Sequence, residues 1–102
     1  MASFNWRFEW DAQKAAANLA KHGITFQQAA TVLLDPLAVT NFDEEHSNGE
    51  ERWVTLGLSI AGIALVVVHT FEQQGPDAAN VRVISARPAT RAEMRNYEEG
   101  TL

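Results

Sequence analysis

The side chains best suited to chemistry in this sequence are the arginines and histidines of its second half. Four arginines but only one acid, Glu93, occur from residue 82 to residue 95. Arg52 directly precedes Trp53, and Arg91 and Arg95 are four residues apart, which places them on one face of a helix. Guanidinium groups beside an aromatic ring suit a phosphodiester backbone with stacked bases. The same arginines could instead solvate a surface or form ion pairs, and spacing alone leaves both interpretations open.

Three histidines could transfer protons near neutral pH, and each also has a structural interpretation. His22 follows Lys21 at the end of a predicted helix, where cations complement the helix dipole. His46 lies in an acidic loop and could simply be solvated. His69 shares strand parity with Val67, which is typical of a hydrogen-bonded core side chain. For each histidine taken alone, composition favours the structural interpretation.

Residue types and missing motifs exclude several classes of chemistry. The chain has no cysteine, so it can form neither a disulfide nor a thiolate metal site. It has no Walker loop, dinucleotide fingerprint, zinc-protease motif or serine-hydrolase elbow. The acids clustered in 43–51 match no EF-hand and are typical of a solvated loop. We therefore expect neither a metal nor a cofactor.

Length, composition and charge predict one domain over residues 1–102. The chain is 46% hydrophobic and 21% charged, which suits a sizeable core. The N-terminus lacks a signal-peptide pattern, and the apolar stretch 61–68 is far shorter than the roughly 20 residues of a membrane span, so we expect a cytoplasmic protein. The net charge of −5 arises within 1–51, which holds eight acids and three bases, whereas 52–102 holds five of each. This balance excludes a broad basic face but allows a local cationic surface.

The first third of the chain predicts a strand followed by two helices. Aromatic and polar residues alternate over 4–10, which is the period of a half-buried strand. Asp11 is a predicted N-cap for a helix that ends at Gly23, a residue suited to the left-handed position after a helix. A capping box over 25–28 opens a second helix, and Pro36 ends it.

Beyond Pro36 the hydrophobic period changes to that of strands. We expect strands at 37–42, 52–59, 63–71 and 81–86, with an acidic loop at 43–51, a hairpin at Ala61-Gly62 and a mobile loop at 72–80. The run 65–68 is apolar on both faces, which is typical of a central strand. A capping box over 90–93 opens a last helix that ends near Gly100. The order β-α-α-β-β-β-β-α predicts an α+β fold, with helices packed against a mostly antiparallel sheet.

A series of short motifs extends over nearly the whole chain. In order they are FEWD over 8–11, Lys14, Asn18, KHG over 21–23, Phe26, Ala29-Ala30, Asp35-Pro36, HSNGEERW over 46–53, Gly57, Ser59, VVVHT over 66–70, ISAR over 84–87, ATR over 89–91, Glu93 and Tyr97. Each motif alone is unspecific. The ordered set resembles the BrnT family, toxins of type II toxin–antitoxin pairs.

The resemblance implies a RelE-like fold, RNA cleavage that inhibits translation, and a BrnA-like antitoxin of the ribbon-helix-helix type. In such pairs the complex binds operator DNA, and the toxin alone does not. The acidic charge of this chain suits a basic partner of that kind. The competing hypothesis is a non-catalytic acidic module that binds a basic DNA-binding protein.

Metal-free RNA cleavage needs an activated 2′-hydroxyl, a stabilised phosphorane and a protonated leaving oxygen. We expect arginines to bind the phosphate, and histidine, lysine or glutamate to move protons. The candidate catalytic residues are Lys21, His22, Glu51, Arg52, His69, Arg87 and Arg91, and the candidate RNA-binding residues are Trp53, Arg95 and Tyr97. Two features depart from the family pattern: the 72–80 loop is longer than usual, and Glu72 and Ala92 stand where basic residues are expected.

Overall fold

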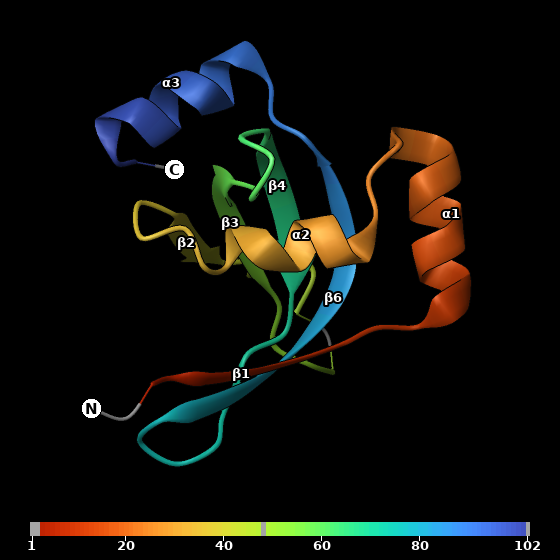
Figure 1. The fold of residues 1–102 in the computed structure, drawn as a ribbon, viewed down its shortest axis with the longest axis vertical. Coiled ribbons are helices and arrows are strands. Elements are labelled where there is room, and N and C mark those ends of the chain that lie inside the picture. Colours follow the sequence, from red (N-terminus) through yellow and green to blue (C-terminus); the bar gives the residue numbers. More distant parts are fainter. Residues whose placement is uncertain (1–2, 48, 102) are drawn as a thin grey trace.

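A six-stranded sheet forms the centre of the molecule, and three helices surround it in the computed structural model, which describes residues 3–47 and 49–101 (Figure 1). The elements are β1 (Asn5–Glu9), α1 (Ala12–His22), α2 (Phe26–Val32), β2 (Val39–Phe42), β3 (Trp53–Leu58), β4 (Ala64–His69), β5 (Glu72–Gln73), β6 (Ala78–Pro88) and α3 (Arg91–Glu99). The α+β class is as predicted from the sequence.

The sheet has the strand order β1-β6-β4-β3-β2, with β5 paired to β6 outside this path. β4 lies in the middle, as its doubly apolar run predicts. β2–β3, β3–β4, β4–β6 and β5–β6 are antiparallel, but β1 and β6 are parallel, so the sheet is mixed. This parallel pairing joins the two ends of the chain, and no local sequence pattern indicates it.

The prediction of a mobile loop at 72–80 is wrong, because this segment forms a hairpin. β5 pairs with the start of β6, and the amide of Gln74 donates to the carbonyl of Ala78 at 2.8 Å. Gly75 has a positive φ of 76°, which glycine adopts at little cost. β6 begins at Ala78 because β5 and β1 both supply hydrogen-bonding partners there. The element order therefore contains one strand more than predicted.

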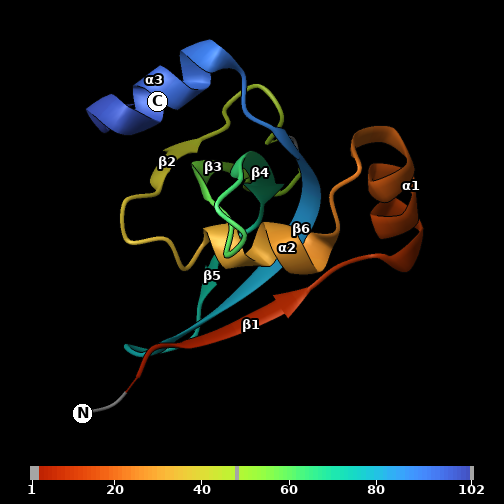
Figure 2. The same ribbon diagram turned by 45° about the horizontal axis from the view of Figure 1, so that its top comes forward.

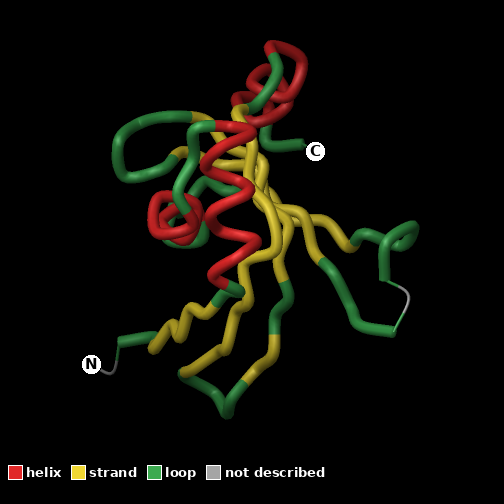
Figure 3. Tube along the Cα trace, turned by 90° about the vertical axis from the view of Figure 1, so that its right-hand side faces the viewer, coloured by secondary structure: helices red, strands yellow, loops and turns green. Residues whose placement is uncertain are grey.

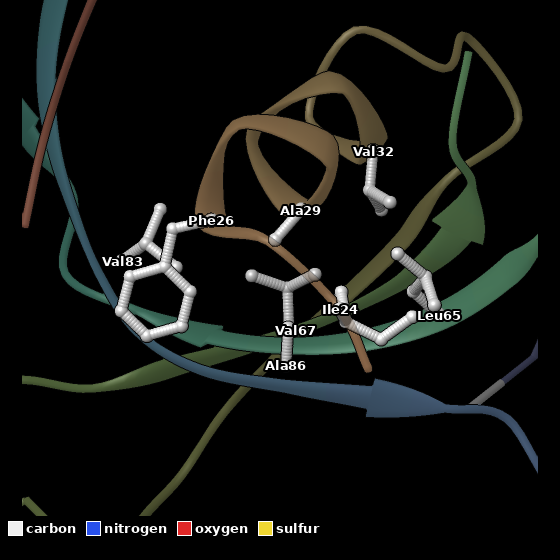
Figure 4. Close-up of a cluster of buried hydrophobic side chains, with 8 residues drawn as sticks. All are labelled: Ile24, Phe26, Ala29, Val32, Leu65, Val67, Val83 and Ala86. Carbon is white, nitrogen blue, oxygen red and sulfur yellow. The ribbon is translucent and has the colours of Figure 1, made fainter. Parts of the chain in front are cut away.

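Helix α2 covers one face of the sheet and forms the main core. Its N-cap is Thr25, whose side chain accepts a hydrogen bond from the amide of Gln28. Buried side chains from α2, the segment before it, β4 and β6 pack together (Figure 4): Ile24, Phe26, Ala29, Val32, Leu65, Val67, Val83 and Ala86. The helix ends at Val32, several residues before Pro36. In Figure 3, the long β2–β3 loop extends from the side of the sheet opposite α2.

Helix α1 packs against the edge of β6 beyond the point where β1 ends. β1 pairs with β6 only as far as Arg82, so the second half of β6 lacks a strand on that side. Asn18 of α1 is buried there; its side-chain amide donates to the carbonyls of Ala86 and Ile24, and its oxygen accepts from the amide of Ala86. One side chain thus replaces the missing strand's hydrogen bonds at this position.

Helix α3 lies beyond the end of the sheet at which β6 stops (Figures 1 and 2). Thr90 and Glu93 form the predicted capping box, and Gly100 ends the helix with a positive φ of 76°. The Tyr97 hydroxyl donates to Asp35 Oδ2 at 2.7 Å, which ties α3 to the turn after α2. Asp35 can lie so close to β3 because Gly57 has no side chain: a Cβ there would be 3.1 Å from Asp35 Oδ2.

Candidate functional site

Arg52, Arg82 and Arg87 belong to the face of the sheet opposite α2. Pairing of β4 with β6 shifts between Val68 and His69, so β6 contains a bulge. Because of it, Val83 and Ala86 both belong to the core beneath α2 although they are three residues apart. Arg82 and Arg87 flank this stretch and therefore both project from the opposite face, where strict alternation would separate them.

Glu50 joins Arg82 to Arg52 on this face. Arg82 Nη2 lies 2.5 Å from both carboxylate oxygens of Glu50, and Arg52 Nη2 lies 3.7 Å from one of them. The Nε of Arg52 is buried and has no hydrogen-bonding partner in the described part of the chain. Two guanidinium groups share one carboxylate, so these three side chains together carry one net positive charge. Glu9, Glu51 and Glu72 line the hollow beside them, so the surface around the pair is acidic.

His46 lies in the β2–β3 loop, whose base is hydrogen-bonded to the backbone of Arg52. At its base the amide of Asp43 donates to the carbonyl of Arg52 at 2.8 Å, while Ser47 Oγ accepts from the amide of Arg52 and donates to the carbonyl of Asp43. His46 Nδ1 lies 3.1 Å from both carboxylate oxygens of Asp43, and its side chain is 65% exposed. Asp43 thereby orients the ring through Nδ1.

Sequence reasoning missed the pairing of Glu50 with Arg82, because these residues are far apart along the chain. The HSNGEERW stretch over 46–53 contains two of the three side chains, Glu50 and Arg52. His46 is exposed in its loop, as its structural interpretation predicts. Asp43, three residues before His46, is the local signal for an oriented histidine.

Arg87 is engaged by Glu93 at the start of α3. Its two terminal nitrogens lie 2.8 and 2.9 Å from the two Glu93 oxygens, and one of these also accepts from the amide of Thr90. The hydrogen bonds from Arg87 outweigh partial burial and lower the pKa of Glu93 to about 2. The same pair raises the pKa of Arg87. Arg87 therefore links the sheet to α3, and the charge of Glu93 balances its own.

Because of the ion pair between Arg87 and Glu93, we expect the stability of the fold to decrease in acid. A carboxylate with a depressed pKa stabilises the fold above its unfolded-state pKa, and this contribution disappears as the pH falls from about 4.5 to about 2. Because the Arg87 side chain is 44% exposed, we expect only about 1 kcal/mol from the pair. Glu93→Gln should lose this amount at pH 7 and show a correspondingly flatter stability profile between pH 5 and pH 2, measured by urea unfolding. An unchanged pH profile would contradict the assignment.

Lys21 and His22 lie at the end of α1, towards the end of β6. His22 follows Asn18 by four residues and so shares its helix face, and Asn18 is bonded to Ala86. His22 is half-buried, whereas Lys21 is exposed. Arg91 and Arg95 are exposed on α3. Among the described residues no ion pair or hydrogen bond joins these four side chains to the group around Glu50.

His69 and Trp53 lie on the other face, beneath the turn after α2. His69 is 1% exposed; its Nδ1 donates to the carbonyl of Thr70 at 2.8 Å, and its Nε2 lies 2.7 Å from Thr55 Oγ1. Burial lowers the pKa of His69 despite the bond to Thr70, so the ring is neutral at pH 7. The structure thus shows the hydrogen-bonded core histidine that strand parity indicates, separated by the sheet from the arginines.

Tyr97 and Glu51 lie in different parts of the molecule: Tyr97 is bonded to Asp35, and Glu51 is near Glu50 and Arg82. The hydrogen bond to Asp35 raises the pKa of Tyr97. Partial desolvation raises the pKa of Asp35, but hydrogen bonds from the amides of Leu58 and Leu37 and from Tyr97 lower it overall. Glu51 is exposed and lines a hollow of about 360 Å³ beside Glu50 and Arg82.

The comparisons with known proteins identify the family. Residues 10–93 match the model of the ribonuclease toxin BrnT of type II toxin–antitoxin systems. The chain belongs to the BrnT family. It is also similar to the crystal structure of the Brucella abortus ribonuclease toxin BrnT, with 25% identity and a TM-score of 0.53, over 85% of this chain and 99% of that chain. No curated protein matches the chain.

Membership of the BrnT family supports a ribonuclease toxin that acts with an antitoxin, as the ordered motifs imply. The described residues contain no group of three or more histidine, cysteine, aspartate or glutamate side chains arranged to hold a metal ion. None of the helices in 3–47 and 49–101 is long and apolar enough to cross a membrane.

Proposed function

We propose that this BrnT-family chain cleaves RNA without a metal ion, on the face of the sheet that carries Arg52, Arg82 and Arg87. The observation that carries the proposal is the shared carboxylate of Glu50, which holds two guanidinium groups. His46, which Asp43 orients, lies in the loop whose base is hydrogen-bonded to the backbone of Arg52. Phosphate is a bidentate acceptor for guanidinium groups. Arg52 is the arginine with the weakest ion pair of the three, since its Nη2 lies 3.7 Å from Glu50 and its Nε has no hydrogen-bonding partner among the described residues. A bound phosphate would compete with Glu50 for these donors.

The reaction that these groups fit is an internal transesterification. The ribose 2′-oxygen attacks the adjacent phosphorus, the bond from phosphorus to the 5′-oxygen breaks, and the products are a 2′,3′-cyclic phosphate and a 5′-hydroxyl. Glu50 or Glu51 would accept the proton of the 2′-hydroxyl, and His46 in its protonated form would donate one to the leaving oxygen. The arginines stabilise the charge that develops on the phosphorane.

The remaining cationic candidates lie on two helices. Arg91 and Arg95 are on α3, and Lys21 and His22 are in the last turn of α1. We assign these side chains to binding the RNA backbone on either side of the cut. His69 is buried on the other face, so a proton-transfer role for it has less support than one for His46.

The proposal includes a basic antitoxin of the ribbon-helix-helix type and action in the cytoplasm through translational inhibition. The net charge of −5 and the acids around Arg82 favour a cationic partner. Operator DNA would then be bound through that partner, because the toxin itself has a net negative charge. A RelE-like arrangement of sheet and helices is part of the same proposal.

Incubation of the purified chain with RNA in excess chelator tests this function. We expect cleavage products that end in a 2′,3′-cyclic phosphate and a 5′-hydroxyl, identified by mass spectrometry, and we expect one equivalent of the antitoxin to stop the reaction. If RNA stays intact at high protein concentration while the antitoxin still binds, the chain acts as a non-catalytic acidic partner.

A further inference from the structure

The face beneath α2 contains a pocket that the proposed cleavage does not use. Its volume is about 460 Å³, within the range of about 300–1,000 Å³ that small-ligand sites occupy. Aromatic rings supply much of its wall, and one end is polar; the residues that the argument uses are Trp6, Trp53, Phe71, His69, Thr55 and Thr40.

The rings come from three separate segments of the chain. Trp6 lies on β1, Trp53 begins β3, and Phe71 lies between β4 and β5. The Trp6 and Phe71 rings are 6.2 Å apart at an angle of 71°, which places an edge of one against a face of the other. Aromatic surfaces of this kind stack any of the nucleobases, because every base has a π-face.

A chain of three hydrogen-bonded side chains forms the polar end. The proton of neutral His69 is on Nδ1, because a carbonyl oxygen can only accept and Nδ1 contacts that of Thr70. His69 Nε2 must therefore accept from Thr55, and the Thr55 oxygen in turn accepts from Thr40 at 2.7 Å. The Thr40 hydroxyl oxygen keeps a lone pair that can accept from a ligand.

Trp53 supplies a donor that nothing satisfies. Its indole Nε1 is buried and has no hydrogen-bonding partner within residues 3–47 and 49–101. A buried donor without a partner costs about 1–3 kcal/mol, so a ligand that offers an acceptor gains by binding there. The walls of the pocket thus include aromatic rings, a buried indole donor without a partner and a threonine oxygen with an unused lone pair.

We propose that this pocket binds a nucleobase, which stacks against the tryptophan rings, accepts from Trp53 Nε1 and donates to the Thr40 hydroxyl. A base fits better than a phosphate because no arginine or lysine lines the pocket and Asp35 does. Asp35 already accepts from Tyr97 and from the amides of Leu37 and Leu58, so it is not a free partner for a cation.

The pocket and the arginine group lie on opposite faces of the sheet and come nearest to each other at Phe71. Phe71 lines both this pocket and the hollow that contains Arg82 and Glu50, and Arg52 and Trp53 are consecutive residues at the start of β3. In an RNA, a base in the pocket and a neighbouring phosphate at Arg52 would be a short distance apart along the strand. This source of the base rests on the proposed ribonuclease function, whereas a free nucleoside would bind without it.

Titration of the full chain with the four uncharged ribonucleosides tests the proposal without any cleavage. In ¹⁵N–¹H spectra, we expect the Trp53 indole signal to shift on saturation, while the Trp10 signal, on the core side against Phe26, stays in place. Trp53→Phe keeps an aromatic ring but removes the donor, so it should bind about tenfold more weakly. The matched control Trp10→Phe should bind as the unaltered chain does.

Parallel binding and cleavage measurements separate this proposal from the ribonuclease proposal. Nucleoside binding that Trp53→Phe weakens supports the pocket, whether or not RNA is cut. If RNA cleavage also loses its preference for one base in Trp53→Phe, the base comes from the RNA substrate. Cleavage without any nucleoside binding, or equal affinity in Trp53→Phe and Trp10→Phe, overturns the pocket and leaves the ribonuclease proposal standing.

Discussion

Arg52→Ala is expected to reduce RNA cleavage by about 10²–10³-fold, the usual cost of removing one preorganised donor to a developing oxyanion. Arg52 is the sharpest position to test because its Nε has no partner and its ion pair to Glu50 is long, at 3.7 Å. Its charge is therefore the least committed to holding the fold. The measurement is single-turnover cleavage of a labelled RNA in excess chelator.

Two control variants show whether the loss reflects charge placed at this position. Arg52→Lys keeps the charge and should recover part of the rate, although lysine lacks the planar fork. Arg7→Ala removes the same charge from the exposed edge strand β1 and should cleave nearly as fast as the unaltered chain. Equal rates in Arg52→Ala and Arg7→Ala would place the phosphate elsewhere. Arg87→Ala is less informative alone, since it also releases Glu93 and α3.

Asn18→Leu is expected to lower the free energy of unfolding by about 3–5 kcal/mol, because it leaves two carbonyls and one amide without a partner. These groups belong to Ile24 and Ala86 and are buried where α1 covers the edge of β6. A small domain is stabilised by only about 5–15 kcal/mol in total, so the variant should be close to unfolding at 37 °C. Urea unfolding followed by circular dichroism gives the value.

Gln13→Leu is the matched control for Asn18→Leu. Gln13 is exposed on the same helix, so this change removes an amide of similar kind without orphaning a buried group, and we expect an effect within about 0.5 kcal/mol. Asn18→Asp keeps the acceptor but loses both donors, so it should also be strongly destabilising. A loss below about 1 kcal/mol in Asn18→Leu would mean that water replaces the amide at this edge.

Local chemistry in the sequence determined most of the elements. Asp11 caps α1, and Thr90 with Glu93 forms a capping box, because a side-chain oxygen within three residues satisfies the free amides of a helix start. Gly23 ends α1 in the left-handed conformation that glycine adopts freely. The doubly apolar run of β4 similarly required a central strand. Such features depend on neighbours along the chain, so the sequence alone is enough to predict them.

The tertiary structure alone decided which side chains meet. Arg82 binds Glu50 across 32 residues, Tyr97 binds Asp35 across 62, and Asn18 binds Ala86 across 68. The bulge in β6 moves Arg87 onto the face of Arg82, and the sheet separates both from His69. The sequence showed that arginines and histidines were available for RNA chemistry. Strand register and one extra residue in β6, both set by long-range pairing, determined that Arg52, Arg82 and Arg87 share a face while His69 is in the core.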